Sequence, residues 1–293
     1  MQLPTFLIVG VQKAGTTSIY NYLQEHPQVY MSPVKETNFL EKDWENLAKD
    51  KQNKNGIITL EDYSRLFAGV KDEIAIGEAS PNYLFHYESS IPRIQKYVPD
   101  AQLIVVLRNP IERAYSDYLM HIRDAIGYRP LSEQIKYAAD KSFIIRKGFY
   151  YTPIQYYLNS FRAEQVQVFL YDDLIQDSLK FMQSMYRYIG VDDSLEIDTT
   201  KKVQTAKVPK NQAINNLLRR KNPLRTLAAN TLKTVMPLSA RQQIRDRLMN
   251  LNYQSKQATP LSPEDRQGLI NIYREDILKL QDLINRDLSA WIA

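Results

Sequence analysis

The stretch Phe6–Ser18, FLIVGVQKAGTTS, decides the fold of this chain. Its first five residues form an apolar run that ends in Gly10, which is typical of a buried strand. A helical pattern begins after Gly15, so the stretch predicts a strand, a turn and a helix. Backbone N–H groups and the helix dipole make such a junction a site for an anion. Gly15 lets the backbone approach that anion closely, and the hydroxyls of residues 16–18 add donors.

The same stretch resembles the Walker pattern G-x-x-x-x-G-K-[ST], with one change. Gly10 and Gly15 have the Walker spacing, but Thr16 occupies the lysine position and the lysine is Lys13. A Walker lysine reaches the β- and γ-phosphates of a triphosphate, whereas Lys13 lies earlier in the turn. The early lysine therefore predicts a ligand that is a shorter anion than ATP.

A second informative stretch covers residues 103–121, LIVVLRNPIERAYSDYLMH. Its apolar run predicts a strand that ends at Arg108, and Ser116 falls two turns into the helix that follows. Ligands of α/β sheets bind at such strand ends, where an arginine can clamp a phosphate with two hydrogen bonds. The strand lacks the terminal aspartate that magnesium-dependent phosphoryl transfer uses.

Strand-like and helix-like segments alternate over the first half of the chain and continue to Ile189. This order predicts an α/β fold with a central, mainly parallel sheet flanked by helices. The expected strands are Phe6–Gly10, Val29–Met31, Ile74–Gly77, Leu103–Leu107 and Val166–Tyr171. The expected helices are Thr17–Glu25, Thr59–Leu66, Ile111–Arg123 and Ser178–Ile189, with a helical C-terminal region that contains a capping pattern at Ser239 and Gln242 and a long helix from Ser262. Without a repeat or a linker, residues 1–293 are expected to form a single domain.

Composition narrows the classes of protein further. Hydrophobic residues make up 44% of the chain, and the absence of cysteine excludes disulfides and cysteine-based metal sites. No signal peptide or transmembrane segment is expected, so the predicted location is cytoplasmic. Residues 199–245 hold eleven basic and no acidic side chains, which fits either a solvated helical surface or an anion-binding flank. No nucleic-acid reader motif is present, and no nucleic-acid partner is expected.

Together, the stretches around Lys13 and Arg108 resemble the superfamily of sulfotransferases that use 3′-phosphoadenosine 5′-phosphosulfate (PAPS). The resemblance is closest to the branch of the heparan-sulfate and many bacterial enzymes. Further similar stretches are HPQV, VKETNFL, GEASPNYLF, GFYY, VFLYDDLI and YREDILKLQDLINRDLSAWI, so nearly the whole chain is covered. The resemblance implies a P-loop-like three-layer fold and transfer of a sulfonate to an acceptor hydroxyl, with adenosine 3′,5′-bisphosphate (PAP) as product and no metal.

The resemblance also implies roles for individual residues. It assigns the 5′-phosphosulfate to Lys13, Ala14, Gly15, Thr16, Thr17 and Ser18, and the 3′-phosphate to Arg108 and Ser116. Glu36, in the VKETNFL stretch, matches a general base that takes the acceptor proton. Lys13 would stabilise charge on the bridging oxygen of the leaving nucleotide. Tyr150 and Lys207 match loops near the nucleotide, although packing for the tyrosine and a solvated position for the lysine fit equally well.

Two departures from the heparan-sulfate enzymes argue against a glycosaminoglycan acceptor. Ala79 stands where those enzymes have a lysine, and their disulfide is impossible here. Histidine is the base in the small-molecule branch of the superfamily. Of the three histidines, His86 is the one that could line the acceptor cleft, whereas His26 and His121 are expected to be structural.

Two other function classes remain open from the sequence. One is a P-loop nucleotide kinase or nucleoside-triphosphate hydrolase, which the displaced lysine and the missing carboxylate disfavour. The other is a non-catalytic scaffold that holds a nucleotide and uses its basic flank to bind a partner. Within the leading interpretation, carbohydrate, lipid, polyketide and phenol acceptors all fit.

Overall fold

A computed structural model describes residues 2–48, 53, 55–124, 126, 129–196, 208–209, 253–254 and 260–293. The chain forms two compact units, each built from segments that are separate in the sequence. The first unit comprises Met1–Arg113, Lys147–Val203 and Tyr273–Ala293. The second unit comprises Ala114–Arg146 and Gln204–Ile272.

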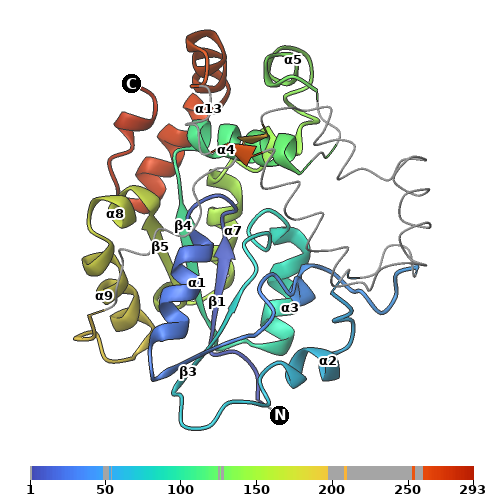
Figure 1. Cartoon of the computed structure of the whole chain (residues 1–293), viewed down its shortest axis with the longest axis vertical. Coiled ribbons are helices and arrows are strands. Elements are labelled where there is room, and N and C mark those ends of the chain that lie inside the picture. Colours follow the sequence, from blue (N-terminus) through green and yellow to red (C-terminus); the bar gives the residue numbers. More distant parts are fainter. Residues whose placement is uncertain are drawn as a thin grey trace. The chain divides into compact units, whose positions relative to one another are not determined.

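A five-stranded sheet forms the core of the first unit (Figure 1). Its strands lie in the order β2-β3-β1-β4-β5, and every neighbouring pair is parallel. Their bounds are β1 Phe6–Gly10, β2 Val29–Met31, β3 Ala75–Ala79, β4 Gln102–Leu107 and β5 Val166–Leu170. β1 and β3 are buried along their whole length, as expected for central strands covered on both faces.

The parallel pairing brings the carboxyl ends of the strands to one edge of the sheet. Ile8 of β1 pairs with Ala79 of β3 and with Ile104 of β4. In Figure 1 the chain leaves the tip of the β1 arrow and turns directly into helix α1 (Thr16–Glu25). Ligands of open α/β sheets bind at this edge, so the fold places the β1–α1 loop where a nucleotide is expected.

Helices surround the sheet within the first unit. Besides α1 they are α2 Leu60–Arg65, α3 Tyr87–Tyr97, α7 Tyr151–Ser160, α8 Tyr171–Gln176 and α9 Ser178–Ile189, with short 3-10 helices η1 Phe39–Glu41, η3 Ala163–Gln165 and η4 Ser289–Trp291. The expected cap of α2 is present, because Thr59 and Asp62 exchange side-chain-to-backbone hydrogen bonds. The predicted α/β class with a parallel central sheet is confirmed.

The described part of the second unit contains helices and a short two-stranded ribbon. Its helices include α5 Leu131–Tyr137 and α6 Phe143–Arg146, and β6 (Val208–Pro209) pairs antiparallel with β7 (Tyr253–Gln254). Two helices contribute residues to both units, α4 Pro110–Arg123 and α13 Pro263–Ile284. The helix α13 confirms the helical C-terminal region, whereas the expected cap at Ser239 and Gln242 lies outside the described residues.

Two local differences from the sequence predictions have physical reasons. The strand expected to reach Tyr171 ends at Leu170, since Tyr171 already begins α8. Helix α3 was not predicted, and it contains Pro92, a residue that usually interrupts a helix. Among the described residues, no helix combines the length and the apolar character that crossing a bilayer requires.

Asp276 of α13 caps the N-terminus of α7. Its carboxylate accepts hydrogen bonds from the backbone N–H groups of Tyr150, at 2.8 Å, and of Tyr151, at 3.3 Å. These N–H groups lack partners within the helix, so an acceptor from elsewhere in the first unit stabilises them. Burial, opposed by these hydrogen bonds, raises the pKa of the Asp276 carboxyl.

We predict that Asp276→Ala lowers the free energy of unfolding by about 1 kcal/mol, the usual cost of a lost cap. Asp276→Asn keeps an acceptor and should cost less. Because the pKa of the carboxyl is higher in the folded state, protonation of Asp276 adds stability at low pH, and this added part is lost as pH rises through that raised pKa while the hydrogen-bonded cap remains. In urea unfolding at a series of pH values, the free energy of unfolding of the wild type should fall relative to that of Asp276→Asn as pH rises. An unchanged difference between the two proteins at every pH would contradict this.

Candidate active site

The loop between β1 and α1 leaves a helix N-terminus open. The first helical hydrogen bond runs from the Ile19 N–H to the Gly15 carbonyl, at 3.1 Å. The preceding N–H groups, at the start of the helix, have no partner within it. The residue before α1 is Gly15, which has no side chain to cap the helix, and no acidic residue lies in the first turn. The backbone of Lys13 and Gly15 is left-handed, with φ of 73° and 75°. This arrangement offers backbone donors and a positive helix end to an anion.

Glycine at position 15 is required by its neighbours as well as by its φ angle. A Cβ there would lie 2.9 Å from both the Tyr171 ring and the Leu174 side chain of α8. Gly10 is similarly constrained, because a Cβ would lie 2.7 Å from Cβ of Leu84. The two glycines of the Walker-like spacing therefore allow the loop to pack tightly within the first unit.

Arg108 is tied to this loop. Its Nη1 donates a hydrogen bond to the Lys13 carbonyl at 2.8 Å, and its guanidinium lies 4.8 Å from the centre of the Tyr171 ring. Among the described residues, no carboxylate forms an ion pair with Arg108. Since a guanidinium has five N–H donors, most of them remain for a ligand beside the loop. The strand end of β4 thus supplies a cation at the place that the sequence predicted.

Tyr150 holds the backbone of Arg108 in place. The tyrosine is fully buried, and its hydroxyl donates to the Arg108 carbonyl at 2.9 Å. Burial raises the pKa of Tyr150, which keeps this hydroxyl protonated. Because the backbone of Tyr150 is held by Asp276, the chain of contacts runs from α13 to the loop. Direct contact of Tyr150 with a nucleotide stays a prediction.

Glu36 lies at the same sheet edge, beside the end of β3. Its backbone is left-handed, with φ of 61°, and its N–H donates to the Ala79 carbonyl at 2.9 Å. The side chain is 38% exposed, and its Oε1 lies 2.6 Å from Nζ of Lys35. The Glu36 turn follows β2, and β3 lies between β2 and β1 in the sheet. Ala79 of β3 pairs with Ile8 of β1, so the residue that holds the Glu36 turn belongs to the strand beside β1.

A small hollow lies beside the first turn of the loop. Its lining residues, all in the first unit, are Val11, Gln12, Pro81, Leu84, Phe85, Lys147, Phe149, Tyr150 and Pro153. Lys147 donates from Nζ to Oε1 of Gln12 at 2.7 Å, and therefore adds a second lysine near the loop. Lys147 directly precedes the GFYY stretch, but no pattern in the sequence predicts it as a site residue.

Glu78 is a second carboxylate that the sequence analysis missed. It is fully buried in β3 and accepts hydrogen bonds only from hydroxyl groups among the described residues. The available signal was a carboxylate inside the apolar run of β3, followed closely by Ser80 and Tyr83. Burial of such a group requires hydrogen-bond partners, so its presence predicts a polar cluster.

The remaining predicted site residues lie outside this part of the first unit. Ser116 lies in α4 and belongs to the second unit, and Lys207 lies outside the described residues. His86 approaches Glu41, with 3.5 Å between Nε2 and Oε1. His26 is buried, and its Nδ1 accepts the Gln28 N–H, in keeping with the structural role expected for it.

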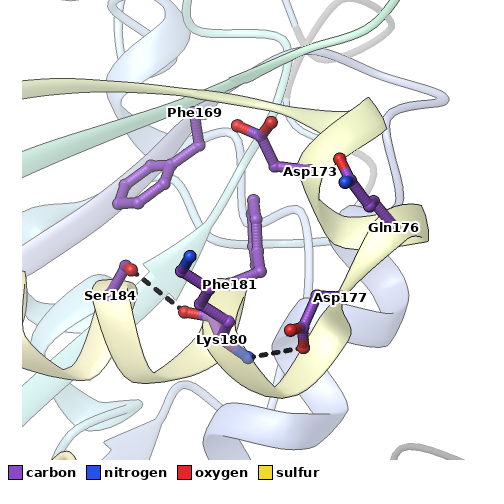
Figure 2. Close-up of a pocket in the computed structure, with 7 residues that line it drawn as sticks. All are labelled: Phe169, Asp173, Gln176, Asp177, Lys180, Phe181 and Ser184. Atoms are coloured by element: carbon purple, nitrogen blue, oxygen red, sulfur yellow. Dashed lines mark hydrogen bonds between the residues drawn. The ribbon is translucent and has the colours of Figure 1, made fainter.

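A larger hollow lies by α8 and α9 and contains none of the predicted site residues (Figure 2). It is lined by Phe169, Asp173, Gln176, Asp177, Lys180, Phe181 and Ser184. Two dashed hydrogen bonds in Figure 2 belong to α9 itself, since Asp177 caps the Lys180 N–H and Ser184 donates to the Lys180 carbonyl. These polar groups serve the helix, so the β1–α1 edge remains the candidate site.

Comparison with known proteins agrees with this geometry. A family model described as the Sulfotransferase family matches residues 4–194. The crystal structure of a sulfotransferase from Alicyclobacillus acidocaldarius superposes with a TM-score of 0.72 at 26% identity, over 100% of both chains.

Two human relatives are similar over part of their length. Carbohydrate sulfotransferase 15 is 32% identical over 151 residues, which is 40% of this chain and 27% of that protein. The bifunctional heparan sulfate N-deacetylase/N-sulfotransferase 3 is 28% identical over 203 residues, 65% of this chain and 22% of that protein. The chain thus spans about a quarter of the length of these relatives. With the family model matched over residues 4–194, this chain belongs to the sulfotransferase family.

Proposed function

We propose that this chain transfers a sulfonate from PAPS to an acceptor hydroxyl and releases PAP, with residues 1–293 acting as one catalytic domain. The observation that carries the proposal is the uncapped N-terminus of α1, which lies beside Lys13 and has Arg108 tied to its loop. Cations and backbone donors converge there on a place for a bound anion. PAPS carries negative groups at the 5′ and 3′ positions of its ribose. This edge of the sheet offers two groups of donors, the start of α1 with Lys13 and the guanidinium of Arg108.

In this proposal the two groups of donors take the two ends of the nucleotide. The N–H groups and hydroxyls of residues 16–18, with Lys13, bind the 5′-phosphosulfate. Arg108 binds the 3′-phosphate through the donors that it does not use on the loop. Ser116 and Lys207 would complete the phosphate contacts. Such contacts would fix the sulfonate for in-line attack by the acceptor.

The chemistry needs one proton acceptor and one stabiliser of the leaving group. A bond forms between the acceptor oxygen and sulfur, while the bond from sulfur to the bridging phosphate oxygen breaks. Glu36 takes the acceptor proton, since its Oε1 is held by Lys35 and its Oε2 makes no hydrogen bond among the described residues. Lys13 stabilises the charge that builds on the bridging oxygen.

We predict that Lys13→Ala lowers kcat by about 10²–10³-fold, because charge on the leaving oxygen loses its stabiliser. Transfer from labelled PAPS to a panel of carbohydrate, lipid and phenol acceptors measures this. Lys180→Ala, which removes an exposed lysine on α9, is the matched control and should leave turnover unchanged. Near wild-type turnover by Lys13→Ala would remove the lysine from the mechanism.

Glu36→Gln should lower kcat by about 10²–10⁴-fold, the range for a lost general base, and leave the affinity for PAP unchanged. The substitution keeps the size of the side chain and removes only its ability to take a proton. Glu61→Gln is the control, since Glu61 is 72% exposed and pairs with Arg65. A kcat equal to that of wild type would show that another group is the base, and no transfer by the wild-type protein to any acceptor would favour a nucleotide-holding scaffold.

Calorimetry should show that PAP binds at least about tenfold more tightly than ATP with magnesium, a difference of about 1.4 kcal/mol. The reason is that Arg108 directly follows β4, at the place where a magnesium-dependent enzyme has a carboxylate. The two titrations need the same protein preparation and the same ionic strength. Tighter binding of ATP with magnesium would instead indicate a kinase or hydrolase.

A further inference from the structure

Glu78 forms the centre of a buried cluster of hydroxyls. Its Oε1 accepts hydrogen bonds from the Thr37 hydroxyl at 2.5 Å, from the Ser80 hydroxyl at 2.5 Å and from the Tyr83 hydroxyl at 2.8 Å. Its Oε2 accepts from the Tyr63 hydroxyl at 2.5 Å. No described cation forms an ion pair with this carboxylate. A carboxyl group that is 0% exposed is therefore surrounded by four neutral hydroxyls that donate to it.

Three of these hydroxyls also accept hydrogen bonds from consecutive backbone N–H groups. The N–H groups of residues 38, 39 and 40 donate to the hydroxyls of Ser80, Thr37 and Tyr83, at 3.0, 3.3 and 3.1 Å respectively. These residues form the start of η1, where N–H groups have no partner within the helix. The hydroxyls therefore cap the start of η1, and each of them donates its own proton to Glu78.

The carboxyl group of Glu78 determines which way each hydroxyl points. All four hydroxyls donate to it, so each directs its single proton inwards. Each oxygen is then left as an acceptor for the backbone of residues 38–40. Burial, reinforced by Glu78, raises the pKa of Tyr63 and of Tyr83 well above the usual value, so both remain protonated donors.

This cap acts on the turn that carries Glu36. Glu36 and Asn38 both have left-handed backbones, with φ of 61° and 52°, which costs free energy for residues other than glycine. Bonds from both sides hold the turn, since Asn53 donates to the Thr37 carbonyl and Asn55 to the Glu36 carbonyl. The hydroxyl cluster anchors the following residues to the end of β3.

We propose that Glu78 is a positioning residue: through the hydroxyls of Thr37, Ser80 and Tyr83 it fixes the Glu36 turn beside the β1–α1 loop. This proposal rests on the proposed role of Glu36 as the general base. Glu78 itself does not meet the substrate. It sets the place from which Glu36 takes the proton, and a misplacement of about 1 Å can cost on the order of 10²-fold in rate.

Hydrogen exchange tests the cap without reference to catalysis. In Glu78→Gln a neutral amide oxygen replaces the carboxylate oxygen and accepts more weakly, so the hydroxyls of Thr37, Ser80 and Tyr83 are held less firmly in the orientation that accepts the backbone N–H groups. We expect the amides of residues 38–40 to exchange at least about tenfold faster than in wild type. Tyr63→Phe is the matched control, because Tyr63 donates to the same carboxylate but accepts no N–H group from these residues. Equal exchange in Glu78→Gln and wild type overturns the proposal.

A narrower substitution covers the case in which Glu78→Gln does not fold. Ser80→Ala removes one hydroxyl and leaves Glu78 with three donors. The amide of Asn38 should then exchange faster, whereas those of residues 39 and 40 should stay protected. Uniform exchange across all three amides, or no change at residue 38, contradicts the cap.

A double-mutant cycle tests the link to catalysis. Glu78→Gln alone should lower kcat by about 10–100-fold while the affinity for PAP stays the same. If Glu78 acts through Glu36, adding Glu78→Gln to Glu36→Gln should lower kcat less than about threefold further. A full, multiplicative loss overturns the positioning role. Unchanged turnover in the single variant Glu36→Gln overturns the assignment of Glu36 as general base. The hydrogen-exchange experiment still tests whether Glu78 holds the cap of η1.

Discussion

The structure of the site depends on the hydrogen bond from Arg108 to the Lys13 carbonyl. This bond joins the carboxyl ends of β1 and β4, which are neighbours in the sheet. Arg108 is itself held by the buried hydroxyl of Tyr150, and the backbone of Tyr150 is held by Asp276 of the C-terminal helix. Segments that are far apart in sequence therefore hold the backbone from which one guanidinium extends. Without them, the loop would lose the cation that an anionic ligand meets beside the helix end.

Much of this fold could be predicted because local signals agree with the tertiary structure. Helix α9 begins at Ser178 and ends at Ile189 as expected, since Asp177 caps its start and Gly190 adopts the left-handed conformation that ends it. Helix α3 was missed, because Pro92 argues against a helix in any local window. There, packing within the first unit overrides the local preference.

The candidate site was predicted less completely than the fold, because some of its residues are far apart in the sequence. Lys13 and Arg108 stand out as residues at strand ends, and the parallel sheet alone brings strand ends together. The Glu78 cluster joins hydroxyls from three segments, before η1, in α2 and after β3, and the partner farthest along the chain is 41 residues away. No periodicity connects such residues, so only the folded chain reveals which hydroxyls face the carboxylate.

The two carboxylates near this edge illustrate how surroundings separate the roles of identical side chains. All four hydrogen bonds to Glu78 come from protein hydroxyls, which occupy the sites that a carboxylate offers, and the side chain is closed to solvent. An acceptor's proton therefore has no route to Glu78. Glu36 has the opposite features, because it is 38% exposed and Lys35 occupies only one of its oxygens. A base must both reach its substrate and retain an open lone pair. Of these two residues, Glu36 alone meets both conditions, whereas Glu78 is suited to hold the turn on which Glu36 lies.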